Sequence, residues 1–175
     1  MEDWKLNIVA LVYVRDQLMK ADKEKIWEYH WPNIAATKEE IHEIQRKLNI
    51  NLSIEYQNFL LHANGWECFY QNVDLFGTNE FESDKMEYAR EILSLEMEYN
   101  EDLREMKEDL FPIAVSRDDI DLFVMVIRKG NRFGEVIWLA GGEIDKYESF
   151  SEFFKAMIEY NKMNAEDLQK EREDI

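Results

Sequence analysis

Residues 120–127 constrain the fold more than any other stretch of this chain. After Asp121 the segment reads Leu-Phe-Val-Met-Val-Ile, so an extended strand would carry apolar side chains on both of its faces. Such a strand is stable in the middle of a sheet, where other elements cover both faces. Glycines begin and end residues 130–134 and predict a turn, after which residues 135–140 predict an antiparallel neighbouring strand.

Helices that could cover this sheet are predicted at both ends of the chain. Residues 3–19 repeat apolar side chains at near-helical spacing, although residues 9–14 alone are also compatible with a strand. Thr37 and Glu40 form a capping box that opens a second helix, and Ser53 can cap a third helix, which stops near Asn64-Gly65. Another capping box at residues 149–152 opens a final helix. Its apolar stripe consists of Phe150, Phe153, Phe154, Met157 and Ile158.

Between the third and the final helix the chain alternates between strand and helix patterns. Residues 67–70 and 73–76 predict two short strands around a turn, and residues 112–115 predict another strand. Residues 84–110 predict an acidic helix, whose apolar stripe is interrupted by Glu96. We therefore expect an α+β fold: a mostly antiparallel sheet, packed by N-terminal helices and a C-terminal helix, with an acidic helical insertion.

The domain organisation follows from length and punctuation. A chain of 175 residues with two prolines and no Gly/Ser/Pro-rich linker predicts a single domain over residues 1–175. Its core is expected at residues 32–158, with an N-terminal helix within residues 1–31 and a charged extension at residues 159–175.

The charge of the chain restricts its partners. The formal net charge is −17, and residues 79–110 hold twelve acidic and four basic side chains, a net of −8 in that segment. Such a surface repels phosphate backbones and anionic lipid, which argues against nucleic acid and membrane as partners. A basic protein is the expected partner.

The chain start and the cysteine usage predict a compartment. The first residues are acidic and lack the basic region of a secretory signal. The single cysteine, Cys68, cannot form an internal disulfide. Both features favour a cytoplasmic location.

No strong catalytic or cofactor motif is found. His30, His42 and His62 stand in separate elements without metal-ligand spacing, and Cys68 has no second thiol or histidine close to it in the sequence. Gly141-Gly142 lacks the later glycine and lysine of a phosphate-binding loop. We therefore expect no catalytic residues, no cofactor and no tightly bound metal.

Two places are candidates for partner contacts. One is Trp66 and Glu67, because aromatic side chains after a glycine stop can anchor a partner, although core packing is their commoner fate. The other is the acidic cluster of Asp118, Asp119 and Asp121. Alternative interpretations of this cluster are a solvated strand entry and the carboxylates of a hydrolase or metal site.

The order of short motifs resembles the SUKH superfamily, in the branch of a yeast glucan-synthesis regulator and of bacterial toxin-immunity proteins. The resemblance covers residues 32–158, and two positions depart from the family pattern: Ser53 replaces a proline, and Ile120 stands before Asp121 in place of a glycine. The matching motifs are Glu40-Ile41, residues 52–61, Asn64-Gly65-Trp66, Leu75-Phe76-Gly77, Pro112-Ile113-Ala114, residues 134–138 and residues 149–153.

The resemblance implies an α+β domain without known catalytic residues. For a bacterial member it implies an immunity protein that neutralises a co-encoded toxin, and the acidity of this chain suits a toxin domain of nuclease type, whose substrate-binding surface is basic. The alternative function is an intracellular scaffold or regulator of cell-envelope synthesis.

Overall fold

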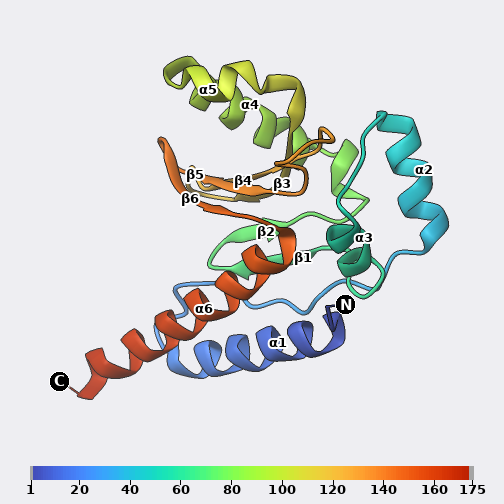
Figure 1. Ribbon diagram of the computed structural model, residues 1–175. Helices are drawn as coiled ribbons and strands as arrows, with labels where there is room; N and C mark the ends of the chain where they lie inside the picture. Colours follow the sequence, from blue (N-terminus) through green and yellow to red (C-terminus); the bar gives the residue numbers. More distant parts are fainter. Residues whose placement is uncertain (1, 174–175) are drawn as a thin grey trace.

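A computed structural model describes residues 2–173 and shows a single six-stranded sheet between layers of helices (Figure 1). The strands are β1 (Trp66–Tyr70), β2 (Val73–Leu75), β3 (Leu110–Ser116), β4 (Leu122–Val126), β5 (Val136–Leu139) and β6 (Glu143–Tyr147). They lie in the order of the sequence, and each pairs antiparallel with the next. The predicted α+β class and antiparallel sheet are confirmed.

The central strand is covered on both faces, as its sequence requires. All five residues of β4 are buried. Figure 1 shows α4 (Asp84–Tyr99) and α5 (Glu101–Glu105) on one side of the sheet and α6 (Phe150–Glu173) on the other. The predicted acidic helix of residues 84–110 is two α-helices, because Asn100 leaves the helical conformation and its side chain caps α5 at Leu103. Its predicted end is also wrong: a short 3-10 helix spans Lys107–Asp109, and Leu110 already belongs to β3.

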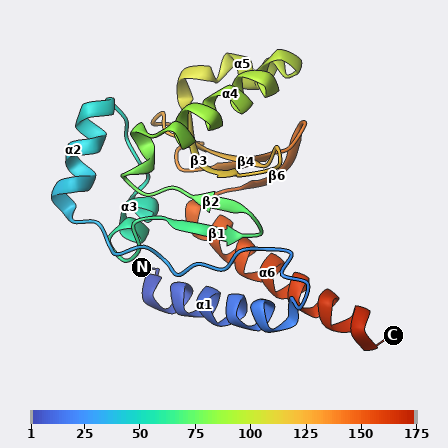
Figure 2. The same cartoon turned by 180° about the vertical axis from the view of Figure 1, so that it is seen from behind.

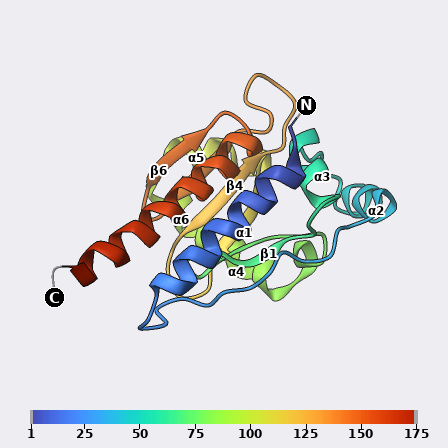
Figure 3. The ribbon, with the colours of Figure 1, turned by 90° about the horizontal axis from the view of Figure 1, so that it is seen from below.

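The N-terminal helix α1 (Trp4–Ala21) packs beside α6 on the same side of the sheet (Figures 1 and 3). Trp4 is buried, and its ring meets the rings of Phe59, Phe150 and Phe154. Aromatic side chains from α1, α3 (Ile54–Leu60) and α6 thus share one cluster. The N-terminal helix is part of the hydrophobic core.

Other helices begin where the caps predict. The Thr37–Glu40 capping box opens α2 (Lys38–Leu48), and the Ser53 hydroxyl accepts from the backbone of Tyr56 to open α3. At α6 the predicted box is changed: Glu152 donates its backbone N–H to Ser149, but its carboxylate accepts from the backbone of Glu148. The residues expected as a charged extension continue α6 as far as residue 173, and residues 174 and 175 lie outside the described part of the chain.

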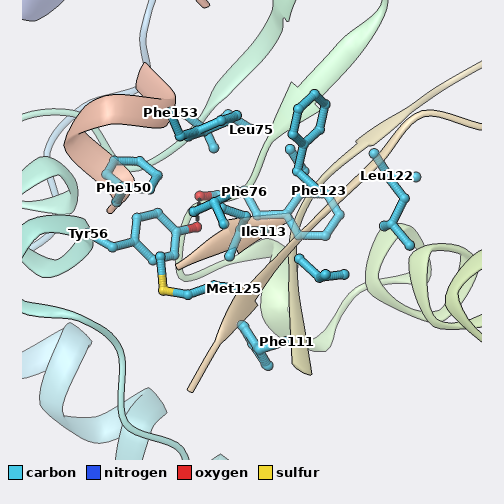
Figure 4. Close-up of a cluster of buried hydrophobic side chains, with 14 of the residues drawn as sticks. Tyr56, Leu75, Phe76, Phe111, Ile113, Leu122, Phe123, Met125, Phe150 and Phe153 are labelled. Atoms are coloured by element: carbon cyan, nitrogen blue, oxygen red, sulfur yellow. Dashed lines mark hydrogen bonds between the residues drawn. The ribbon is translucent and has the colours of Figure 1, made fainter. Parts of the chain in front are cut away.

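Two glycines allow a close approach of backbones behind α3. A Cβ on Gly65, whose φ is +86°, would stand 2.6 Å from the nitrogen of Gly77, and a Cβ on Gly77 would stand 2.2 Å from the carbonyl oxygen of Asn64. Helix α3 ends at Leu60, four residues before the predicted stop at Asn64-Gly65, so Gly65 does not cap it. Next to this contact the Tyr56 hydroxyl donates to the Phe76 carbonyl at 2.6 Å, in the centre of the core (Figure 4).

Strand β6 was not predicted from the sequence. Four of its five residues are exposed and three of those are charged, because it is the last strand of the sheet and has a neighbour on one side. Charged side chains on an edge strand discourage further strand pairing. In the described residues no helix is both long and apolar enough to span a membrane.

Candidate functional site

Glu67 lies near the loop that carries Asp118, Asp119 and Asp121, because this loop of residues 117–121 packs on the turn between β1 and β2. The Arg117 backbone N–H donates to the Asn72 carbonyl at 3.0 Å, and the Asn72 side chain donates to Asp118 at 2.7 Å. Arg117 also reaches the side chain of Glu67 in β1. The fold thus connects Glu67 with Asp118, which the sequence analysis treated as separate candidates.

Trp66 has a different place. Its side chain is 1% exposed, and its indole N–H donates to the His30 carbonyl at 2.8 Å. A partner on the surface would find almost no area of this ring. Trp66 joins the segment between α1 and α2 to strand β1. It therefore packs in the core, which the sequence analysis gave as the commoner fate of such an aromatic side chain.

Arg117 is the centre of an ion-pair network. Its Nε lies 3.0 Å from both carboxylate oxygens of Asp74, and its terminal nitrogens meet Glu28 and Glu67. Asp74 is buried within β2 and also pairs with Lys85 at 2.8 Å. Burial by itself would raise the pKa of Asp74, but the hydrogen bonds from Arg117 and Lys85 hold that pKa below its ordinary value. Asp74 therefore stays ionised and fixes the loop.

The aspartates of the loop differ in exposure. Asp118 and Asp119 are exposed, whereas Asp121 is partly buried and accepts the indole N–H of Trp138 at 2.7 Å. Desolvation raises the pKa of Asp121 despite that bond. In the described part of the chain, the carboxylates of Asp118, Asp119 and Asp121 do not form a group whose oxygens lie close enough together to hold a metal ion. Asp118 and Asp119 are thus the two available for a partner.

The loop borders an apolar groove that the sequence analysis missed. The groove measures about 360 Å³ and lies between the end of α4, the loop of residues 117–121 and the turn between β5 and β6. Three apolar side chains of its lining are widely exposed: Tyr99 at 90%, Leu95 at 58% and Ile120 at 50%. We call this feature the acidic groove, defined by the lining residues Ile92, Leu95, Glu96, Tyr99, Asn100, Ile120, Gly141 and Gly142.

A buried carboxylate holds the groove together. Glu96 accepts the backbone N–H of Gly141 at 2.6 Å and so ties α4 to the turn between β5 and β6. This bond explains the polar residue that interrupts the apolar stripe of α4, because a carboxylate within a buried stripe needs a hydrogen-bond partner. The sequence showed the interruption but not the backbone group that Glu96 contacts.

Exposed carboxylates stand next to several lining residues of the groove in the sequence. They belong to Glu91, Glu98, Glu101, Asp119 and Glu143. The described lining of the groove has no basic side chain. By contrast, Arg90 and Lys107 line a larger hollow of about 550 Å³ between α4 and the residues after α2. A largely apolar lining without basic side chains, next to acidic residues in the sequence, therefore distinguishes the acidic groove.

Comparison with family models places most of this chain in a known family. The model described as the SMI1/KNR4 family (SUKH-1) matches residues 35–156, which begin just before α2 and end within α6. The matched region contains the whole sheet and the acidic groove, whereas α1 precedes it. The resemblance inferred from the short motifs is confirmed. A search of curated proteins finds no significant match.

Proposed function

Because the chain belongs to the SMI1/KNR4 (SUKH-1) family, we propose that it is an immunity protein that binds a cognate toxin domain and blocks its activity. This family includes toxin-immunity proteins. The acidic groove is the proposed contact surface, and the observation that carries this choice is the exposure of Tyr99, Leu95 and Ile120 in one groove that has no basic side chain in its described lining.

The apolar side chains of the groove would supply most of the affinity. In protein interfaces a few aromatic and aliphatic anchors that lose contact with water dominate the binding free energy. Tyr99 is well suited to this role, because it is almost fully exposed in the free protein and could bury both its ring and its hydroxyl against a partner. Burying Leu95 and Ile120 with it would add to the gain.

The carboxylates would select the class of partner. A toxin of nuclease type binds phosphate groups through a basic surface, and a protein with a net charge of −17 attracts such a surface. Complementary charge mainly accelerates association and excludes wrong partners. Exposed charges are screened beyond about 8 Å at physiological salt, so the charge contribution should be sensitive to salt.

The proposal is tested with the toxin domain encoded beside this chain. Production of the chain should restore growth to cells that make the toxin, and the purified pair should associate at least about tenfold more slowly when salt is raised. Tyr99→Ala should accelerate dissociation by about tenfold or more. The matched control is Tyr13→Ala, which removes a ring that is 64% exposed on α1.

Two outcomes would contradict the proposal. If growth is not restored, or if the chain captures proteins of cell-envelope synthesis and not the toxin, the regulatory alternative is favoured. If growth is restored but Tyr99→Ala behaves as Tyr13→Ala does, the immunity function stands and the acidic groove is the wrong surface.

A further inference from the structure

Three side chains of metal-ligating type come together outside the acidic groove. Glu28 and His30 lie between α1 and α2, and Cys68 lies in β1. One ligand atom from each lies within 4.8 Å of the others. The sequence analysis expected no metal site because the spacing of these residues in the sequence matches no metal-binding motif. That argument did not consider which residues the fold brings together.

The fold brings them together by bonding the connecting segment to β1. This segment runs along β1 in both views of the ribbon (Figures 1 and 2). The Trp66 indole donates to the His30 carbonyl at 2.8 Å, and the Asn33 backbone donates to the Gly65 carbonyl at 3.0 Å. Earlier in the segment, Asp22 accepts from the backbones of Ile26 and Trp27. The place of His30 beside β1 is thus fixed by hydrogen bonds at several points.

Cys68 is presented by an irregular position in β1. Its φ is +48°, and the pairing of β1 with β2 shifts register between Trp66 and Tyr70. The Cys68 backbone donates to Asp74 at 2.9 Å, which holds the residue in this conformation. The side chain is fully buried, and in the described part of the chain its sulfur has no hydrogen bond.

The other two ligands are accessible and already close. His30 Nε2 lies 3.0 Å from a carboxylate oxygen of Glu28, and both side chains are exposed. A tetrahedral zinc centre with ligand bonds of about 2.0–2.3 Å separates its ligand atoms by roughly 3.3–3.8 Å. Small rotations of the exposed Glu28 and His30 side chains would close the group from its present distances.

The charges around the group are compatible with a dication. Arg117 bonds Glu28, and the Arg15 guanidinium donates to the Glu28 carbonyl at 2.7 Å. The charge of Arg117 is offset by Asp74 and Glu67. A thiolate, a carboxylate and a neutral imidazole around Zn²⁺ sum to zero charge, so the two guanidinium groups would face a neutral centre.

We propose that Glu28, His30 and Cys68 form a binding site for a divalent cation of the zinc type. A donor set of one sulfur, one nitrogen and one oxygen suits zinc better than magnesium or calcium, which prefer oxygen alone. A bound ion would tie the segment between α1 and α2 to strand β1. Three protein ligands leave one coordination position for water or a further group.

The same three side-chain types also occur in thiol hydrolases, but the surroundings of Cys68 do not suit that chemistry. Its sulfur is fully buried, so an external substrate cannot reach it. Burial also raises the pKa of the Cys68 thiol to about 11, which leaves it protonated in the absence of a metal.

The test is a titration of the metal-free full chain with Zn²⁺ by calorimetry, together with Co²⁺ as a spectroscopic substitute. We expect one equivalent of zinc to bind and cobalt to give the charge-transfer absorption of a thiolate ligand. Cys68→Ser should abolish that absorption, and His30→Gln should weaken zinc binding by more than about tenfold. His42→Gln, which changes an exposed histidine on α2, should change neither.

Stability of the variants is checked on the metal-free proteins. Because Glu28 and His30 are exposed, His30→Gln and Glu28→Gln should unfold close to the wild-type temperature even if Cys68→Ser is less stable. Absence of stoichiometric zinc binding, or zinc affinity that is equal in wild type, His30→Gln and Glu28→Gln, would overturn the proposal. The latter result would mean that zinc binds only scattered surface carboxylates.

Discussion

Replacing Phe154 with alanine tests the aromatic cluster that joins α1, α3 and α6. Phe154 is fully buried, and its ring centroid lies 5.4 Å from that of Trp4, 5.5 Å from Phe59 and 6.4 Å from Phe150. Burial of the ring and the cavity left behind set the cost of such a change at about 3–5 kcal/mol. For a chain of this size, that loss lowers the midpoint of thermal unfolding by roughly 6–20 °C.

Thermal and urea unfolding followed by circular dichroism would measure this loss. The matched control is Met163→Ala, on the same helix at a side chain that is 53% exposed, which should cost less than about 0.5 kcal/mol. A loss below about 1 kcal/mol for Phe154→Ala would refute the packing of α6 described above. It would also remove the argument that α1, which precedes the family-matched region, belongs to the core.

Three further changes test other parts of the structure. Asp74→Asn should lower the unfolding free energy at neutral pH. Because the fold holds the pKa of Asp74 below its ordinary 3.8, the stabilisation by the carboxylate is lost as pH falls from 3.8 through the lowered pKa, and the difference in unfolding free energy between variant and wild type should shrink there. A difference that stays constant with pH would contradict this assignment. Gly77→Ala places a Cβ against the Asn64 carbonyl and should cost about 1–3 kcal/mol; a neutral effect in urea unfolding would contradict the close approach. Tyr56→Phe removes the buried bond to Phe76 and should cost about 1–3 kcal/mol in the same assay, and unchanged stability would contradict a stabilising role of that bond.

Local rules predicted most of the helices and the central strands. The capping residues Thr37 and Ser53 begin α2 and α3 where expected, and the apolar run after Asp121 is the buried strand β4. These features depend on residues close together in the sequence. Strand β6 escaped prediction because an edge strand with charged side chains lacks the apolar alternation on which strand prediction depends.

The candidate sites were harder to predict because they depend on contacts between distant segments. The role of Glu96 requires the backbone of Gly141, and the grouping of His30 with Cys68 requires the connecting segment to lie along β1. Exposure also decided between alternatives that the sequence left open: Trp66 is inside the core, whereas Tyr99 is on the surface. Apolar periodicity alone does not separate these two aromatic residues.

Hydrogen exchange of the chain with and without its co-encoded toxin domain tests the central claim most directly. If the acidic groove is the contact surface, binding should slow exchange in residues 95–102, 117–121 and 140–143, which line or border it. Exchange in residues 5–13 of α1, which lie away from the groove lining, should stay unchanged. Protection of α1 with no change around Tyr99 would contradict the account.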